Sequence, residues 1–244
     1  MIKRKKLTME DLLTGDFSQI TMEDLIYNGF SGQYLDSEPT ADQIKVACIG
    51  DSITYGHGIY NWPEQNYPQV LQTLLGDHYH VRNFGVCGRC VQDNTDQPYR
   101  MEERYRQSLA YGADIIVFMM GTNDSKPENW HGEAAFKQAA EELLDCYLTG
   151  EKNPEIYLCT PATAFFAEGF TGTVTKFDVQ PGIVDILSGL IREIAQTRGY
   201  SLIDIHTLTD KNPQWFAADS VHPDNASATA IAEAVFKAIT YSAA

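Results

Sequence analysis

The strongest constraint on the fold is the run from Asp114 to Met120, which is apolar after its first residue and ends at a glycine. A strand of this kind is typical of the centre of a parallel sheet, where helices cover both faces. Further strands are predicted near residues 44–49, 79–84, 155–160 and 201–205. Helices are predicted between or after them, near residues 65–76, 98–110, 132–148, 180–198 and 226–240. This alternation predicts right-handed βαβ units in an α/β fold, a three-layer α/β/α sandwich.

Residues 1–43 form an extension ahead of this pattern, so we divide the chain into an extension at 1–43 and a main domain at 44–244. The segment Thr8–Leu12 recurs as Thr21–Leu25, and each threonine can cap a short helix with acidic residues in its first turn. Packing of two small helices on the domain surface is one interpretation, and a contact with a partner or with a second copy in a homo-oligomer is the other. Residues 32–42 are predicted to be a linker.

Charge and hydropathy exclude several classes of partner. The net charge of −15 argues against nucleic acid and anionic membranes, which select basic faces. No apolar run approaches the roughly 20 residues of a membrane span. Four basic residues at the start are followed by a polar segment, Leu7–Asp11, where a secretory signal would need an apolar one. We therefore expect a cytoplasmic protein without membrane or nucleic-acid partners.

The cysteines and histidines predict neither a metal nor another cofactor. The five cysteines are odd in number and lie mostly in or beside predicted strands and helices, which favours free buried thiols. Cys87 and Cys90 form a C-x-x-C, so a zinc or redox role is the alternative, but no second pair completes a zinc site. Five of the six histidines lack metal-ligand spacing, and surface or packing roles are expected for them: His57, His78, His80, His131 and His206.

Turn-forming and polar residues follow the first three predicted strands. The first strand ends in Gly50-Asp51-Ser52-Ile53, the second in Asn83-Phe-Gly-Val-Cys-Gly88, and the third in Gly121-Thr-Asn-Asp124. A further block, Asp219-Ser-Val-His222, stands near the end of the chain. Because the carboxyl ends of parallel strands share one edge of the sheet, where ligands bind in open α/β folds, a site is expected there.

In order and approximate spacing, these four blocks resemble those of the SGNH (GDSL-type) serine hydrolase family, over about residues 44 to 240. The resemblance implies a flavodoxin-like fold with five parallel strands and hydrolysis without a metal. It carries the nucleophile role to Ser52, the base to His222 and the orienting carboxylate to Asp219. A serine oxygen needs such a base, and the base needs a third group to fix its tautomer. The oxyanion donors are then the backbone N–H groups of Ser52 and Gly88 and the side-chain amide of Asn123.

Each block also has a plain structural interpretation. Asp51 and Ser52 can cap a helix. Asp219 can be a capping residue next to a surface histidine, and Gly85, Gly88 and Gly121 can be turn glycines after strands. Asp51, counted among the candidate substrate contacts, is expected to fix the loop as an acceptor rather than act as an acid.

The substrate expectation rests on loop residues and on the resemblance. Tyr60, Trp62 and Trp130 follow strand ends, where their rings can stack on a sugar or cover the edge of the core. His131 and the polar segment at 168–173 are placed on loops near the same edge. The pattern resembles carbohydrate O-acetylesterases, so we expect a serine esterase that removes acetyl groups from a saccharide. A lysophospholipase or thioesterase, or a non-catalytic binding module on the same fold, is the alternative.

Overall fold

The computed structural model describes residues 36–150, 152–166, 175 and 177–242. The short helices expected in the first 35 residues and the loop expected at 168–173 lie outside the described residues. The described residues from Ser37 onward form one compact unit. The division of the chain at residue 43 stays a prediction.

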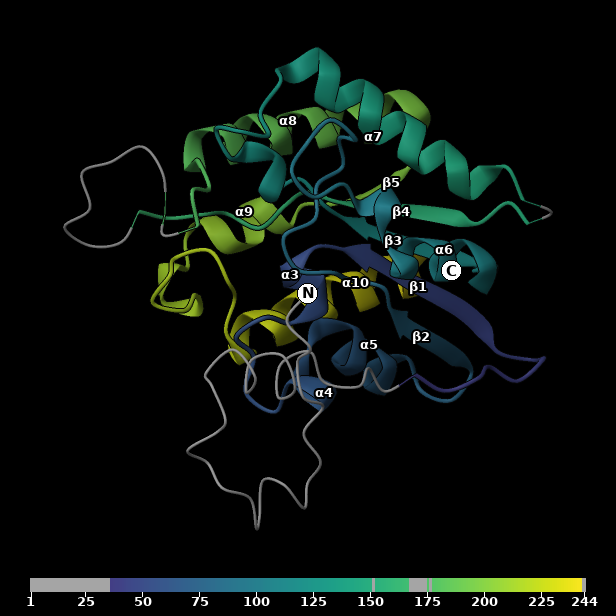
Figure 1. Ribbon diagram of the computed structural model, residues 1–244. Coiled ribbons are helices and arrows are strands. Elements are labelled where there is room, and N and C mark those ends of the chain that lie inside the picture. The colour runs from purple at the N-terminus through teal and green to yellow at the C-terminus, as the bar shows by residue number, and fades with distance from the viewer. Residues whose placement is uncertain (1–35, 151, 167–174, 176, 243–244) are drawn as a thin grey trace, which may run out of the picture. The chain divides into compact units, whose positions relative to one another are not determined.

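The predicted strands form one parallel sheet of five strands in the order β2-β1-β3-β4-β5 (Figure 1). Strand β1 lies between β2 and β3, with Cys48 opposite Asn83 on one side and Val117 on the other. The predicted α/β sandwich of five parallel strands is thereby confirmed. The strands are β1 (Ile44–Gly50), β2 (Tyr79–Asn83), β3 (Ile115–Met119), β4 (Glu155–Cys159) and β5 (Ser201–Ile203).

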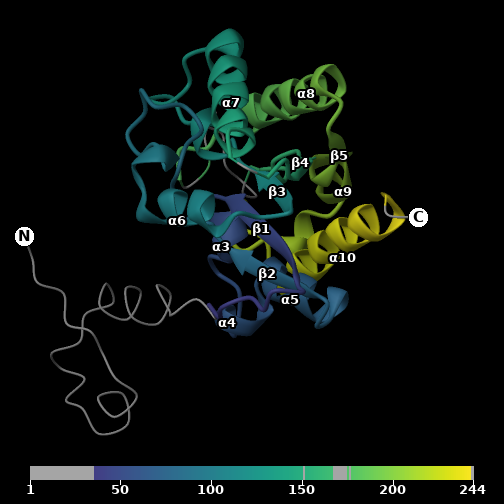
Figure 2. The same ribbon diagram turned by 90° about the vertical axis from the view of Figure 1, so that its right-hand side faces the viewer.

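Helices cover both faces of the sheet. Helices α7 and α8 lie together on one face, while α5 and α10 lie together on the other (Figures 1 and 2). The longer helices are α5 (Tyr67–Leu75), α6 (Glu103–Tyr111), α7 (Glu133–Leu148), α8 (Pro181–Arg198) and α10 (Asn225–Ser242). The shorter ones are α3 (Ser52–Tyr55), α4 (Trp62–Gln65), α9 (Ile205–Asp210) and the 3-10 turns η3 (Tyr99–Met101), η4 (Asn123–Ser125) and η5 (Pro213–Trp215).

Two predicted helices begin later than expected, for local reasons. The helix expected at 65–76 is divided, because Asn66 leaves helical geometry and caps α5, its side chain accepting from the Gln69 N–H. Pro68 stands in the first turn of α5, where its missing N–H costs nothing. The helix expected at 98–110 is divided at Glu102, whose extended backbone separates η3 from α6.

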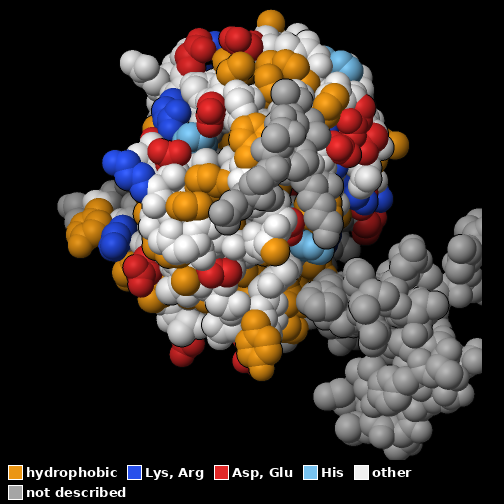
Figure 3. All heavy atoms as spheres, turned by 90° about the vertical axis from the view of Figure 1, so that its left-hand side faces the viewer, with side chains coloured by type: hydrophobic (Ala, Val, Ile, Leu, Met, Phe, Trp, Pro, Cys, Tyr) orange, Lys and Arg blue, Asp and Glu red, His pale blue; other side chains and the backbone are white. Residues whose placement is uncertain are grey.

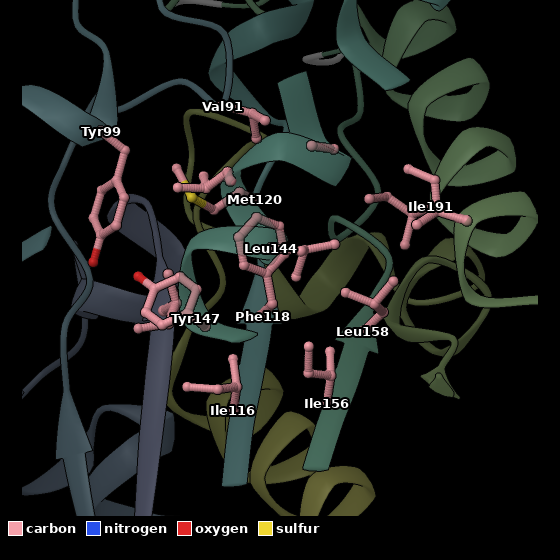
Figure 4. Packing of buried hydrophobic residues seen from close by; sticks show 14 of the residues in the cluster. Val91, Tyr99, Ile116, Phe118, Met120, Leu144, Tyr147, Ile156, Leu158 and Ile191 are labelled. Carbon is pink, nitrogen blue, oxygen red and sulfur yellow. The ribbon is translucent and has the colours of Figure 1, made fainter. Parts of the chain in front are cut away.

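The largest described core cluster lies between the sheet and helices α6, α7 and α8 (Figure 4). Strand β3 supplies Ile116 and Phe118, α7 supplies Leu144, and α8 supplies Ile191, all at most 1% exposed. Every residue of β3 is buried, as a central strand covered on both faces requires. This packing fixes the strand ends, from which the loops of the site emerge.

The carboxyl ends of the strands lie toward the left of Figure 1, the side that Figure 3 turns to the viewer. Figure 3 shows histidine, acidic and apolar side chains there, with lysine and arginine side chains standing beside acidic ones. Among the described residues, no helix is both long enough and apolar enough to cross a membrane.

Candidate active site

Ser52 is held on a tight turn directly after β1. Asp51 caps the short helix α3, its Oδ1 accepting from the Ile53 N–H at 2.9 Å. Gly50 has no room for a side chain, since a Cβ there would come within 2.7 Å of the Met119 carbonyl oxygen. The turn therefore places the Ser52 side chain, 6% exposed, at the carboxyl edge of the sheet between β1 and β3.

His222 and Asp219 reach Ser52 from a loop ahead of α10. The Ser52 Oγ lies 2.9 Å from His222 Nε2, and His222 Nδ1 lies 3.0 Å from Asp219 Oδ2. The other carboxylate oxygen of Asp219 accepts the backbone N–H groups of Val221 and His222, each at 2.9 Å. The chain of contacts is thus closed from the carboxylate through the imidazole to the hydroxyl.

This geometry selects one tautomer of the His222 ring. An ionised Asp219 only accepts hydrogen bonds, so His222 Nδ1 carries the proton that it donates to the carboxylate. Nε2 is then the nitrogen with a free lone pair, and it can accept the proton of the Ser52 hydroxyl. Ser52, which is 170 residues from His222 in the sequence, is brought to the Asp219–His222 pair with the polarity that nucleophile activation needs.

Asp219 keeps its charge well into the acid range. Burial alone would raise the pKa of Asp219, but the hydrogen bonds from the His222 side chain and backbone and from Val221 outweigh it and lower the pKa to about 2. The carboxylate consequently remains ionised throughout the neutral and weakly acid range.

The lowered pKa of Asp219 predicts a pH-dependent contribution to stability. Because its pKa is about 2 in the folded chain and 3.8 ordinarily, the contribution is complete above about pH 5 and is lost as the pH falls toward 2. The difference in Tm between the wild type and Asp219→Asn should therefore be constant above about pH 5 and shrink below about pH 4. For a domain of this size, each kcal/mol lost from the free energy of unfolding lowers the Tm by about 2–4 °C. Thermal unfolding of both proteins between pH 7 and 2 measures it. A difference that grows toward acid pH would contradict this account.

Gly88 and Asn123 carry the other two groups that are expected to act as oxyanion donors. Both line the same pocket as Ser52 and His222. Gly88 has a φ of +80°, which a glycine adopts freely and most other residues do not. One hydrogen of the Asn123 amide is donated to the Arg89 carbonyl oxygen at 3.2 Å, which leaves the second hydrogen to point elsewhere. A neutral amide and backbone N–H groups beside a nucleophilic hydroxyl are the donor set that a developing oxyanion requires.

Asp124 ties together the two loops that carry these donors. Its carboxylate accepts the backbone N–H groups of Val91 and Gln92, so the turn after β3 is joined to the loop after β2. Burial raises the pKa of Asp124 to about 7, although these bonds act in the opposite direction. Its role was not predicted from the sequence, although it stands within the Gly-Thr-Asn-Asp block. Because polar residues after strands fit many roles, its position in that block was the only available signal.

The pocket at this edge has a volume of about 120 Å³. Its polar wall consists of Ser52, His57, Gly88, Asn123 and His222, together with Thr122 and Lys126. Its apolar wall comes from Phe177, Val179 and Val221. A larger pocket of about 440 Å³ lies near Lys45, Tyr111 and Lys152, at the opposite, amino ends of the strands, away from this chemistry.

A sequence model of the GDSL-like lipase/acylhydrolase family matches residues 48–229, which include all four blocks. The chain belongs to this family. The family resemblance stated from the motifs is thus confirmed, and the ester-hydrolase class is supported by the family itself.

Relatives of this GDSL-family chain include curated proteins and solved structures. An acetylxylan esterase of Xylanibacter ruminicola is 34% identical over 219 residues, 82% of this chain and 44% of that protein. An uncharacterised esterase of Bacillus subtilis is 24% identical, over 81% of this chain and 52% of the other. The chain thus spans about half the length of these two relatives.

Two solved structures share the fold of this GDSL-family chain. A carbohydrate acetylesterase family member from Sinorhizobium meliloti has a TM-score of 0.63 at 23% identity, covering 81% of this chain and 97% of that one. The native aryl esterase of M. smegmatis has a TM-score of 0.64 at 17% identity, covering 81% and 98%. Both structures have the α/β/α architecture, although one is named a carbohydrate acetylesterase family member and the other an aryl esterase.

The remaining predicted contacts of the GDSL-family site lie elsewhere. Trp62 is 3% exposed and stacks on Tyr55 at 4.6 Å, so its ring belongs to the core rather than to an open surface. Trp130 packs against the main core cluster, and His131 Nε2 contacts the Asn94 carbonyl oxygen. Tyr60 is 84% exposed. Together with the capping residue Asp51, these four are absent from the described lining of the pocket.

The two cysteines of the C-x-x-C motif lie in different surroundings. Cys87 lines the pocket, whereas Cys90 is buried and its sulfur accepts from the Asn129 amide. Burial raises the pKa of Cys87 to about 12 and that of Cys90 higher still. Both thiols are therefore protonated at neutral pH, which is unsuited to thiolate redox chemistry.

Proposed function

We propose that this chain is a serine esterase that hydrolyses small acyl esters, with Ser52 as nucleophile, His222 as base and Asp219 as the group that orients the base. The observation that carries the proposal is the hydrogen-bonded chain itself, 2.9 Å from Ser52 Oγ to His222 Nε2 and 3.0 Å from Nδ1 to Asp219. Membership of an acylhydrolase family supports it.

The reaction proceeds in two half-reactions. Ser52 Oγ attacks the ester carbonyl while its proton moves to His222 Nε2, and the negative charge develops on the carbonyl oxygen near Gly88 and Asn123. The tetrahedral adduct collapses, the alcohol leaves with the proton from His222, and an acyl-serine remains. Water, deprotonated by the same nitrogen, then releases the acid and restores the Ser52 hydroxyl.

The pocket favours a small acyl group. Its volume of about 120 Å³ is well below the roughly 300–1,000 Å³ of pockets that hold drug-sized ligands. Phe177, Val179 and Val221 offer an apolar wall that suits a methyl group. An acetyl ester fits these dimensions, whereas a long acyl chain would have to leave the described pocket.

We further propose that the alcohol part is a saccharide. The relatives support this choice, since one is named an acetylxylan esterase and one structural neighbour a carbohydrate acetylesterase. Release of acetate from acetylated xylo-oligosaccharides, followed by mass spectrometry of the products, tests the class. Hydrolysis of p-nitrophenyl acetate without any loss of acetyl groups from the saccharides would reject this part of the proposal and keep the esterase.

The size of the pocket predicts the order of rates in an acyl series. With p-nitrophenyl acetate, butyrate and octanoate, kcat/KM is expected to fall at each step, by about tenfold or more from acetate to octanoate, because the added methylenes exceed a described pocket of about 120 Å³. Initial rates at equal enzyme concentration measure it. A rise from acetate to octanoate would instead favour a lipase-like or lysophospholipase-like specificity.

A further inference from the structure

His57, for which a surface or packing role was expected, lies in the wall of the pocket beside the proposed base. Its ring centroid is 4.4 Å from that of His222, with an angle of 53° between the two planes. Phe177 contacts both rings edge-on, 6.4 Å from His57 and 5.1 Å from His222. His57 therefore lies next to the imidazole that must return a proton to the departing alcohol.

The backbone fixes this position firmly. The N–H groups of Gly56 and His57 both donate to the Ser52 carbonyl oxygen, at 3.0 and 2.9 Å, so the loop continues the turn of the nucleophile. Gly56 and Gly58 have φ values of +95° and +82°, and the chain reverses sharply around the histidine. Farther along, the Asn225 side chain exchanges two hydrogen bonds with the Tyr60 backbone, joining this loop to the start of α10.

The ring nitrogens of His57 have no hydrogen-bond partner in the part of the chain that the structure describes. Burial lowers the pKa of His57, and the neighbouring His222 lowers it further, while Asp219 acts in the opposite direction. A neutral imidazole presents one donor and one acceptor, which is the pair that a hydroxyl group can satisfy.

We propose that His57 binds the hydroxyl adjacent to the departing ester oxygen, and that the preferred substrates are esters of vicinal diols, such as a sugar acetylated next to a free hydroxyl. This inference rests on the proposed function and deepens it. The ester oxygen has to lie near His222 Nε2 to be protonated as it leaves. Neighbouring oxygens on a sugar ring are separated by about a hydrogen-bond length. Two imidazoles in contact can therefore serve these two oxygens at once.

A simple packing role for His57 gives a different expectation. If the ring only supports His222, a phenyl ring of similar shape would replace it, and the effect would be the same for every ester. If the ring binds a hydroxyl, its replacement matters only for esters that carry one. A site that hydrogen-bonds a hydroxyl discriminates against the analogue that lacks it, because its own polar group is then left unpaired.

The test compares a xyloside that carries one acetyl group beside one free hydroxyl with its deoxy counterpart, in which hydrogen replaces that hydroxyl. Initial rates give kcat/KM for the wild type, His57→Phe, His57→Gln and Phe177→Leu. The wild type is expected to prefer the hydroxyl-bearing ester by about tenfold or more, on the scale of one hydrogen bond. In His57→Phe the preference should fall to near one, and in His57→Gln, which can still donate and accept, part of it should return.

Phe177→Leu is the matched control, because Phe177 also contacts the His222 ring but has no polar group, and it should keep the preference. Equal rates for the two esters in the wild type, or a preference that survives in His57→Phe, would overturn the inference. Hydrolysis of p-nitrophenyl acetate by the wild type separates these results from failure of the esterase proposal, which would abolish turnover of all three esters.

Discussion

Replacement of Ser52 by alanine is expected to lower kcat/KM for p-nitrophenyl acetate by about ten-thousandfold or more. The loss should be this large because an acyl-enzyme cannot form without the hydroxyl, and only binding and the oxyanion donors remain. The fold should be retained. The variant removes one hydrogen bond, to His222, which corresponds to about 1 kcal/mol and a decrease in Tm of about 2–4 °C.

Ser227→Ala offers a matched control for this variant. Ser227 is fully buried on α10, and among the described residues its hydroxyl has no hydrogen-bond partner. Its loss should leave both the Tm and kcat/KM close to the wild-type values. If Ser52→Ala, freed of wild-type contamination, kept more than about one hundredth of the activity, Ser52 would not be the nucleophile.

The strand frame could be predicted because it depends on local patterns. Apolar runs that end in glycine or polar turn formers, such as those at β1 and β3, have few alternatives in an α/β chain, and all five observed strands begin within one residue of the predicted positions. The proximity of Ser52 to Asn123 then follows, since β1 and β3 are neighbours and both residues stand at their carboxyl ends. The proximity of His222 does not follow in the same way, and it was expected only from the family resemblance.

The orientation of loop side chains could not be predicted from the same patterns. Trp62 lies on a polar segment that resembles an exposed loop, yet its indole N–H donates to the Tyr55 carbonyl oxygen and its ring is buried. His57, for which only a surface or packing role was expected, lines the pocket instead, because the glycines on either side of it adopt left-handed backbone conformations. Local composition indicates that a segment is a loop, but tertiary packing decides which of its side chains face the core, the solvent or a ligand.

The hydrogen-bond partners of the polar groups indicate which side chains can act on the transition state. Asp219, Asp51 and Asp124 all use carboxylate oxygens to fix backbone N–H groups of nearby turns. They hold the site in place before substrate binds. The Asn123 amide differs from them, because Asn123 lines the pocket and its amide donates only one hydrogen bond among the described residues, to the Arg89 carbonyl oxygen. It is therefore the side chain to test for an effect on rate alone.

Replacement of Asn123 by alanine is expected to lower kcat by about a hundredfold to a thousandfold, with a much smaller change in KM. A donor aimed at the developing oxyanion binds the transition state more strongly than the ground state, so its loss affects the rate constant rather than substrate binding. Ser52, His222 and the backbone donors remain in this variant, so measurable turnover should persist. Steady-state kinetics with p-nitrophenyl acetate give both constants.

The Tm of Asn123→Ala separates this role from a structural one. Asn123 is 6% exposed and its amide joins η4 to the Arg89 carbonyl, so some loss of stability is expected in either case. If the amide only ties the loops together, the Tm should fall while kcat stays near the wild-type value at temperatures where the variant is folded. If the amide is an oxyanion donor, kcat should instead fall by at least two orders of magnitude, and this loss should persist at temperatures well below the Tm. A destabilised variant with a near-normal kcat would remove Asn123 from the oxyanion donors and leave that role to the N–H groups of Ser52 and Gly88.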